Sequence, residues 1–134
     1  MKRITGLLVA SGLLAAAAPA MAQSTIRPGE TVRGSLGASD RSLDDGSFYD
    51  CFNLQAQAGQ SLSITLRSDD FDAYLSLHQG GSCDSEIQSD DDGLGDGSDS
   101  RLEHTFGRGG RYSLRANSLS SGETGRYALV VEIE

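Results

Sequence analysis

The alternation that decides the fold is clearest in residues 61–67, which read Ser61-Leu62-Ser63-Ile64-Thr65-Leu66-Arg67. Apolar residues occupy every second position, and polar residues fill most of the positions between them. Because successive side chains of a β-strand point to opposite faces, the pattern predicts a strand with one buried row and one row in water. Such a rhythm is typical of an antiparallel sheet that is covered on one face.

The same period of two recurs along most of the chain. The residues that share one parity in the other segments are Phe48, Phe52 and Leu54; Ala73, Leu75 and Leu77; Leu102, His104 and Phe106; Tyr112, Leu114 and Ala116; and Tyr127, Leu129, Val131 and Ile133. A weaker strand is predicted at residues 31–36, where Gly34 interrupts the pattern. Turn-forming Gly, Asp and Ser separate these segments, which begin about every 10 to 14 residues. The sequence therefore predicts an all-β antiparallel sandwich of about seven or eight strands.

The first 22 residues have the features of an export signal. Lys2 and Arg3 give a positive start, an apolar run follows, and Ala20-Met21-Ala22 has the small-x-small pattern that signal peptidase cuts. We expect residues 1–22 to be a signal peptide cleaved after Ala22, and residues 23–134 to form one domain. Export would place this domain in the periplasm or outside the cell.

The expected mature domain is strongly acidic. It contains 9 Arg, no Lys and 19 Asp and Glu, which gives a formal net charge of −10. This charge repels phosphate, so nucleic acid is not an expected partner. Apart from the signal, no apolar run approaches the roughly 20 residues of a membrane helix, so no membrane span is expected. Arginine can pair bidentately with carboxylates, which suits an acidic surface. The alternative explanation for arginine without lysine is a genome-wide codon bias, which we favour over a binding patch.

Two cysteines, Cys51 and Cys83, offer a single possible intramolecular bridge. In an oxidising compartment such a pair is expected to form a disulfide. A bridge that closes a loop of this length stabilises the fold by roughly 3–4 kcal/mol in the chain-entropy model. A metal-binding or redox pair would need a C-x-x-C spacing or nearby histidines, and the sequence has neither.

An acidic, glycine-rich segment at residues 89–100 is a candidate calcium site. Calcium prefers six to eight oxygen ligands from flexible loops that are rich in Asp and Gly. The alternative is a solvated turn whose Asp side chains bond to their own backbone. The candidate ligands are Asp90, Asp91, Asp92, Asp96 and Asp99, together with Asp72 from an earlier acidic group.

The sequence predicts that the protein is not an enzyme. It has no Gly-x-Ser-x-Gly and no His-Glu-x-x-His, the patterns of common hydrolases. His104 shares its parity with Leu102 and Phe106, which predicts a partly buried, hydrogen-bonded core histidine. His78 has the opposite parity from Leu77, which predicts a side chain on the solvent side.

An exposed aromatic patch is a candidate surface for a partner. It would consist of Tyr49, Tyr74 and His78. The alternative is that outward-pointing tyrosines pack against neighbours on adjacent strands.

Several short motifs occur in a fixed order along the chain. They are Asp50-Cys51-Phe52-Asn53-Leu54 with Ala58-Gly59-Gln60, Phe71-Asp72-Ala73-Tyr74-Leu75-Ser76-Leu77, Asp91-Asp92-Gly93, Asp99-Ser100-Arg101-Leu102, Gly110-Arg111-Tyr112-Ser113-Leu114 and Gly125-Arg126-Tyr127-Ala128-Leu129. Together they resemble the bacterial pre-peptidase C-terminal domain family over residues 29–134. The resemblance implies a jelly-roll-like β-sandwich of the kind that is appended to secreted peptidases. Similar collagen-binding domains of clostridial collagenases bind calcium and collagen, and by resemblance Asp72, Asp91 and Asp92 could hold a loop or join a metal site.

The resemblance implies an exported, non-catalytic accessory module. Its expected partner is a protein or an extracellular polymer, and a secreted peptidase is one candidate. The alternative function is an accessory, chaperone or inhibitor that acts in trans on a secreted protease.

Overall fold

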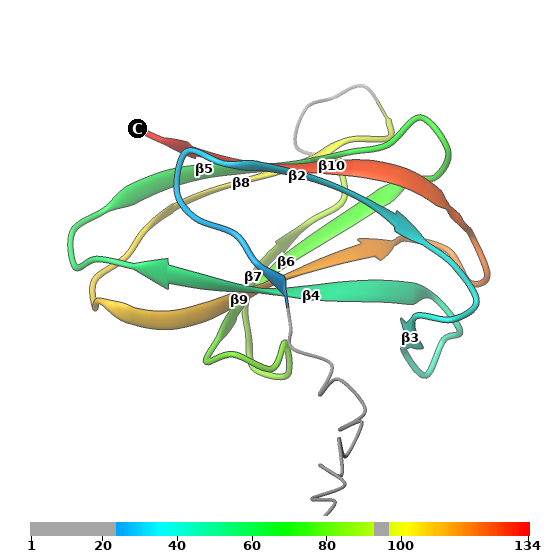
Figure 1. Ribbon diagram of the computed structural model, residues 1–134, viewed down its shortest axis with the longest axis horizontal. Helices are drawn as coiled ribbons and strands as arrows, with labels where there is room; N and C mark the ends of the chain where they lie inside the picture. The colour runs from blue at the N-terminus through cyan, green and yellow to red at the C-terminus, as the bar shows by residue number, and fades with distance from the viewer. Residues whose placement is uncertain (1–23, 93–96) are drawn as a thin grey trace, which may run out of the picture.

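The alternating segments pair into two β-sheets that stack face to face (Figure 1). Their apolar rows are buried between the sheets. The computed structural model describes residues 24–92 and 97–134, so the predicted signal peptide lies outside the described residues. The described strands are β1 (Ser24–Thr25), β2 (Thr31–Leu36), β3 (Arg41–Ser42), β4 (Phe48–Ala56), β5 (Ser61–Arg67), β6 (Ala73–Gln79), β7 (Glu86–Asp90), β8 (Ser100–Thr105), β9 (Gly110–Ser118) and β10 (Gly125–Ile133).

The strand order confirms the predicted antiparallel sandwich. One sheet, here the six-stranded sheet, has the order β1-β4-β9-β6-β7 with β3 paired to β4, and the four-stranded sheet has the order β2-β10-β5-β8. All strand pairs are antiparallel except β1 with β4. Eight strands remain when the two-residue strands β1 and β3 are left out, and they can be numbered in chain order. The four-stranded sheet then has the order first-eighth-third-sixth, and the other sheet has the order second-seventh-fourth-fifth. This interleaving of eight strands is the jelly-roll arrangement.

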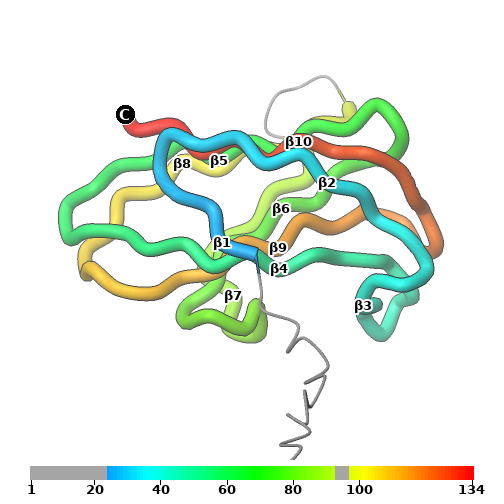
Figure 2. Tube along the Cα trace, viewed as in Figure 1, coloured from blue at the N-terminus to red at the C-terminus, as the bar shows by residue number. Residues whose placement is uncertain are grey.

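The predicted apolar rows form the core. Leu54, Leu62, Leu75, Leu114 and Leu129 are among its fully buried members. The chain passes from β1 to β2 at one edge of the sandwich (Figure 2), and Ile26 on this connection is fully buried. The prediction was wrong for Ile133, which is 62% exposed because it is the last residue of β10 and lies at the rim of the sandwich.

Gly34 does not interrupt β2, because the strand pairs with β10 along its whole length. The ring of Tyr127 occupies the space that a side chain at position 34 would need. A Cβ atom there would lie 2.5 Å from the Tyr127 hydroxyl oxygen. The ring also makes edge-on contacts with Phe52 at 6.4 Å and with Phe71 at 6.5 Å between centroids. Glycine thus lets the edge strand close over a tyrosine in the core.

A loop held by the disulfide covers part of the outer face of the six-stranded sheet. The predicted bond between Cys51 and Cys83 is present, and it joins β4 to the loop that follows β6. The backbone N–H of Cys83 donates a hydrogen bond of 3.0 Å to Ser113 Oγ on β9. The loop therefore returns across β9, next to His78, which is only 1% exposed. The prediction of a solvent-facing His78 was wrong because this tethered loop shields it.

Other polar residues on the outer faces are also buried, contrary to the simple alternating pattern. Ser63 and Thr65 on β5 are buried, as are Ser113 and Asn117 on β9. The Arg101 guanidinium donates from Nε to Ser63 Oγ at 3.0 Å, so long side chains on neighbouring strands cover the short ones. Within residues 24–92 and 97–134, no helix has the length and apolar character that a membrane crossing requires.

Candidate binding surfaces

The acidic segment does not assemble a metal site from the residues that the structure describes. Asp90 Oδ2 accepts a hydrogen bond from the backbone N–H of Arg101 at 2.9 Å. Asp92 Oδ1 accepts one from Gly97 at 3.1 Å, and Asp99 Oδ1 accepts one from Ser68 at 3.1 Å. In the described ranges, no three Asp, Glu, His or Cys side chains come together in a group that could hold a metal ion.

The remaining candidate ligands do not change this result. Asp72 immediately precedes β6, and Asp91 is exposed just after β7. Asp96 lies outside the described residues. The described carboxylates thus do not converge on a calcium site. Asp92 bonds to backbone within the acidic segment, as the alternative of a solvated turn predicts, whereas Asp90 and Asp99 bond to backbone N–H groups outside it.

The predicted aromatic patch contains two of its three members. Tyr49 on β4 and Tyr74 on β6 lie in one row across the sheet, each opposite Asn117 on β9. The guanidinium of Arg115 lies between them, 5.9 Å from the Tyr49 ring centroid and 6.0 Å from that of Tyr74. Both rings are half-buried, so they pack across the strands against one arginine.

His78 does not belong to this patch. Its Nε2 atom is 2.8 Å from Ser76 Oγ, and both residues are buried. Burial lowers the pKa of His78, and the nearby Arg115 charge lowers it further. The Ser76–His78 pair has the spacing of a nucleophile and a base, but substrate could not reach it. No hydrogen-bond partner meets the other ring nitrogen in the described structure, so a carboxylate does not orient this histidine.

His104 behaves as predicted. It is partly buried, its Nδ1 atom lies 3.2 Å from Gln88 Oε1, and its ring centroid is 4.7 Å from that of Phe106. The side chain packs at the rim of the core.

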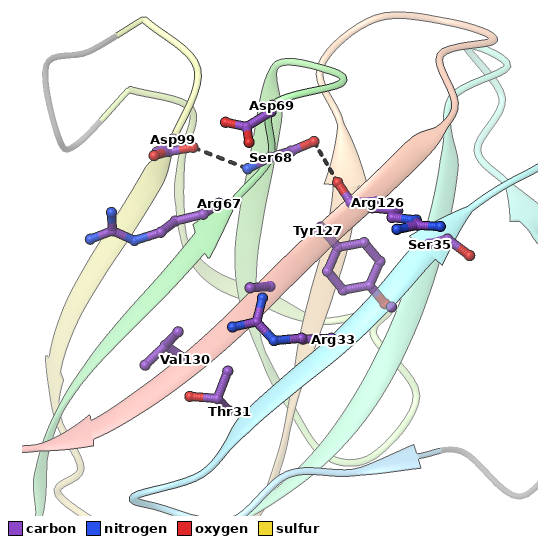
Figure 3. Close-up of a pocket in the computed structure, with 12 residues that line it drawn as sticks. Thr31, Arg33, Ser35, Arg67, Ser68, Asp69, Asp99, Arg126, Tyr127 and Val130 are labelled. Atoms are coloured by element: carbon purple, nitrogen blue, oxygen red, sulfur yellow. Dashed lines mark hydrogen bonds between the residues drawn. The ribbon is translucent and has the colours of Figure 1, made fainter.

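An open groove crosses the outer face of the four-stranded sheet (Figure 3). It has a volume of about 830 Å³ and is lined by residues of β2, β5 and β10 and by the ends of neighbouring loops. Arg33 on β2 lies opposite Ala128 on β10, and Ala128 lies opposite Arg67 on β5. Arg126 precedes Ala128 by two residues and therefore projects from the same face. We call this feature the arginine groove, and define it by Arg33, Arg67, Arg126 and the small floor residue Ala128.

The three arginines of the groove are exposed, and their ion-pairing differs from that of other arginines. Arg27, Arg101 and Arg115 each have a carboxylate oxygen within 4.0 Å. Among residues 24–92 and 97–134, no such ion pair involves a groove arginine. Asp69 and Asp99 line one end of the groove (Figure 3). Sequence reasoning missed this feature because the three arginines lie on three separate strands.

Hydrogen bonds fix the end of the groove where Arg126 lies. Ser68 Oγ donates to the Arg126 carbonyl oxygen at 2.7 Å, and it accepts from the Asp70 and Phe71 N–H groups at 3.1 and 3.2 Å. Asp70 Oδ2 accepts from the Arg126 N–H at 2.7 Å. The turn that follows β5 therefore bonds both the N–H and the carbonyl oxygen of Arg126, and these bonds fix the position of its Cα atom.

A second, smaller hollow lies between β2 and β4 and contains the half-buried carboxyl group of Asp50. Tyr127 Oη donates a hydrogen bond of 2.5 Å to Asp50 Oδ2. Burial raises the pKa of Asp50 to about 6 and outweighs the opposing effect of the Tyr127 hydrogen bond, and the neighbouring Asp40 carboxylate raises the pKa further. Burial and the Asp50 carboxylate also raise the pKa of Tyr127. Asp50 therefore retains a proton at pH values where an exposed aspartate is ionised.

Known structures with a similar fold are found, although no family model and no curated protein sequence matches the chain. The pre-peptidase C-terminal domain of collagenase from Bacillus anthracis is similar with a TM-score of 0.59 and 16% sequence identity, over 81% of this chain and 93% of that chain. The chain has the fold of a pre-peptidase C-terminal domain. The resemblance that the sequence motifs indicated is thus confirmed at the level of the fold.

Two periplasmic lysozyme inhibitors are also similar. PliG of Salmonella Typhimurium, an inhibitor of g-type lysozyme, has 19% identity and a TM-score of 0.48 over 83% of this chain and 98% of that chain. PliG of Aeromonas hydrophila has 16% identity and a TM-score of 0.46 over 81% and 96%.

Proposed function

We propose that this protein is an exported, non-catalytic module that binds a protein partner through an outer face of its β-sandwich. The observation that carries the proposal is the arginine groove, an open surface on a rigid sheet that presents three exposed cations. Binding sites that lie on a rigid scaffold lose little conformational freedom when they engage a partner. The buried Ser76–His78 pair, which substrate could not reach, supports a role without catalysis.

Export is supported by the residue pattern at the start of the chain and by the disulfide. A disulfide persists in the periplasm and outside the cell, whereas cytosolic reductants would keep the thiols reduced. We therefore place the mature domain in the periplasm or the extracellular space.

A peptidase is the first partner to test, because the similar domain from Bacillus anthracis is part of a collagenase. Action in trans on a secreted protease is the corresponding second function. A protease assay with and without the domain separates these ideas, since a pure binding partner leaves the turnover rate unchanged. An accessory or inhibitor changes the rate or the lifetime of the protease.

The experiment that tests the proposal is affinity capture from periplasmic and secreted extracts with residues 23–134 as bait. Captured proteins are identified by mass spectrometry and then tested as purified components. The bait is compared with a variant in which the groove is filled, Ala128→Phe. A protein that binds the unchanged domain directly and not the filled variant supports the proposal. Capture of an extracellular polymer and of no protein would show that the partner is a polymer, which contradicts the proposed protein partner. Capture of neither would refute the proposal.

A further inference from the structure

We infer that the arginine groove is a receptor for a short acidic segment of a protein partner, bound in an extended conformation. The inference rests on the proposed function and names the chemistry of the partner. It depends on three properties of the groove, namely the spacing of its cations, the shape of its floor, and the finding that no carboxylate oxygen of residues 24–92 and 97–134 lies within 4.0 Å of a groove arginine nitrogen.

The spacing of the cations suits carboxylates on an extended chain. Arg33 and Arg67 lie in one row with β10 between them, so their Cα atoms are about 10 Å apart, twice the separation of neighbouring strands. Arg126 lies about 7 Å from Ala128 along β10, the length of two residues. Alternate residues of an extended peptide are also about 7 Å apart and share one face. Two carboxylates at such positions could each reach a guanidinium, which binds a carboxylate with two parallel hydrogen bonds.

The charge of the surroundings favours a short acidic segment over a long polyanion. Three neighbouring guanidinium groups repel one another, and carboxylates from a partner would relieve that repulsion. The rest of the mature domain is acidic, with 19 Asp and Glu against 9 Arg. Asp69 and Asp99 stand at one end of the groove and would repel an anionic chain that continued past it. Attraction is therefore confined to the length of a few residues.

The floor of the groove is small and partly apolar. Ala128 and Val130 are half-buried, and Thr31 lies opposite Val130 at the β2 edge. Because alanine has only a methyl group, it leaves space between the longer side chains of the neighbouring strands. That space could accept the aliphatic part of a glutamate side chain, and filling it should block binding without any change of charge.

The experiment uses the mature domain and a fluorescein-labelled peptide that alternates Ser and Glu, with a Ser–Gln peptide of the same length as the uncharged probe. Binding is followed by fluorescence anisotropy at low and at physiological salt. We expect saturable binding of the Glu peptide that weakens as salt rises, because salt screens exposed ion pairs. Absence of saturable binding at millimolar peptide, or equal binding of the Gln peptide, would overturn the inference.

Matched variants separate the groove from the net charge. The variant R33Q/R67Q/R126Q removes the groove arginines, and R27Q/R108Q/R111Q removes three exposed arginines elsewhere. We expect at least about a tenfold loss of affinity for the groove variant and for Ala128→Phe, and no more than about a twofold change for the control. Equal losses in both triple variants would show a net-charge effect and overturn the inference. Circular dichroism verifies that each variant is folded.

Two further results identify the occupant and separate the two proposals. Tighter binding of dextran sulfate than of the Glu peptide would assign the groove to an anionic polymer and overturn the inference. A purified protein partner that still binds R33Q/R67Q/R126Q with full affinity would also overturn it, while the proposed function would stand. If neither the peptide nor any protein binds the domain, both proposals fail.

Discussion

Removing the disulfide should destabilise the fold strongly. The bond closes a long loop, and it also holds the loop after β6 against the outer face of the six-stranded sheet. Cys51 and Cys83 are 32 positions apart. In the chain-entropy model, a closed loop of this length stabilises the folded state by about 3–4 kcal/mol. A domain of this size has a net stability of about 5–15 kcal/mol, so the double variant Cys51→Ala, Cys83→Ala should lose a large part of it.

The assay is urea unfolding followed by circular dichroism, with the oxidised domain and the double variant measured side by side. We expect the free energy of unfolding to fall by about 3–4 kcal/mol and the melting temperature to fall by about 12–25 °C. The denatured variant is less constrained, so its dependence on urea should be steeper. A loss below about 1 kcal/mol, with an unchanged urea dependence, would refute the reasoning.

A second variant separates the covalent link from local anchoring of the loop. Ser113→Ala removes the hydrogen bond that holds the Cys83 N–H but keeps the disulfide. It should cost about 1 kcal/mol and speed amide exchange at Cys83 without exposing the whole face. If Ser113→Ala destabilised the domain as much as loss of the disulfide, the loop-closure account would be wrong.

Three further predictions concern the core, the half-buried carboxyl group of Asp50 and calcium. Gly34→Ala should cost about 1–3 kcal/mol in urea unfolding because its methyl group would lie 2.5 Å from the Tyr127 hydroxyl oxygen, whereas Gly37→Ala, with open space around it, should be nearly neutral. The raised pKa of Asp50, about 6 against an ordinary 3.8, means that its contribution to stability is present below about pH 4 and is lost as pH rises through 6. Asp50→Asn should therefore raise the melting temperature at neutral pH, and this gain should shrink as the pH falls toward 4. Calcium should leave the melting temperature unchanged, because the described carboxylates do not converge. A calcium-dependent rise that Asp91→Asn, Asp92→Asn abolishes would contradict that expectation.

The strands and most of the core were predictable from the sequence, because side-chain direction in a strand depends only on local backbone geometry. Leu62, Ile64 and Leu66 face the core as their alternation predicted. The disulfide was predictable for another reason, since only two cysteines are present. The pattern did not reveal β7, in which Ile87 is 42% exposed and no apolar row marks the strand.

The exposure and the neighbours of residues on the outer faces of the sandwich could not be predicted from the sequence, because they depend on tertiary structure. His78 has a polar-row position, but the tethered loop after β6 covers it, and no local pattern reports what crosses a strand from outside. Arg33, Arg67 and Arg126 become neighbours only because β10 inserts between β2 and β5 in one register. Alternation by itself determined which side of each strand faces the core. The order and register of strands far apart in the chain decided which outward-facing residues share a surface and which of them are covered, because pairing between distant segments is a property of the whole fold.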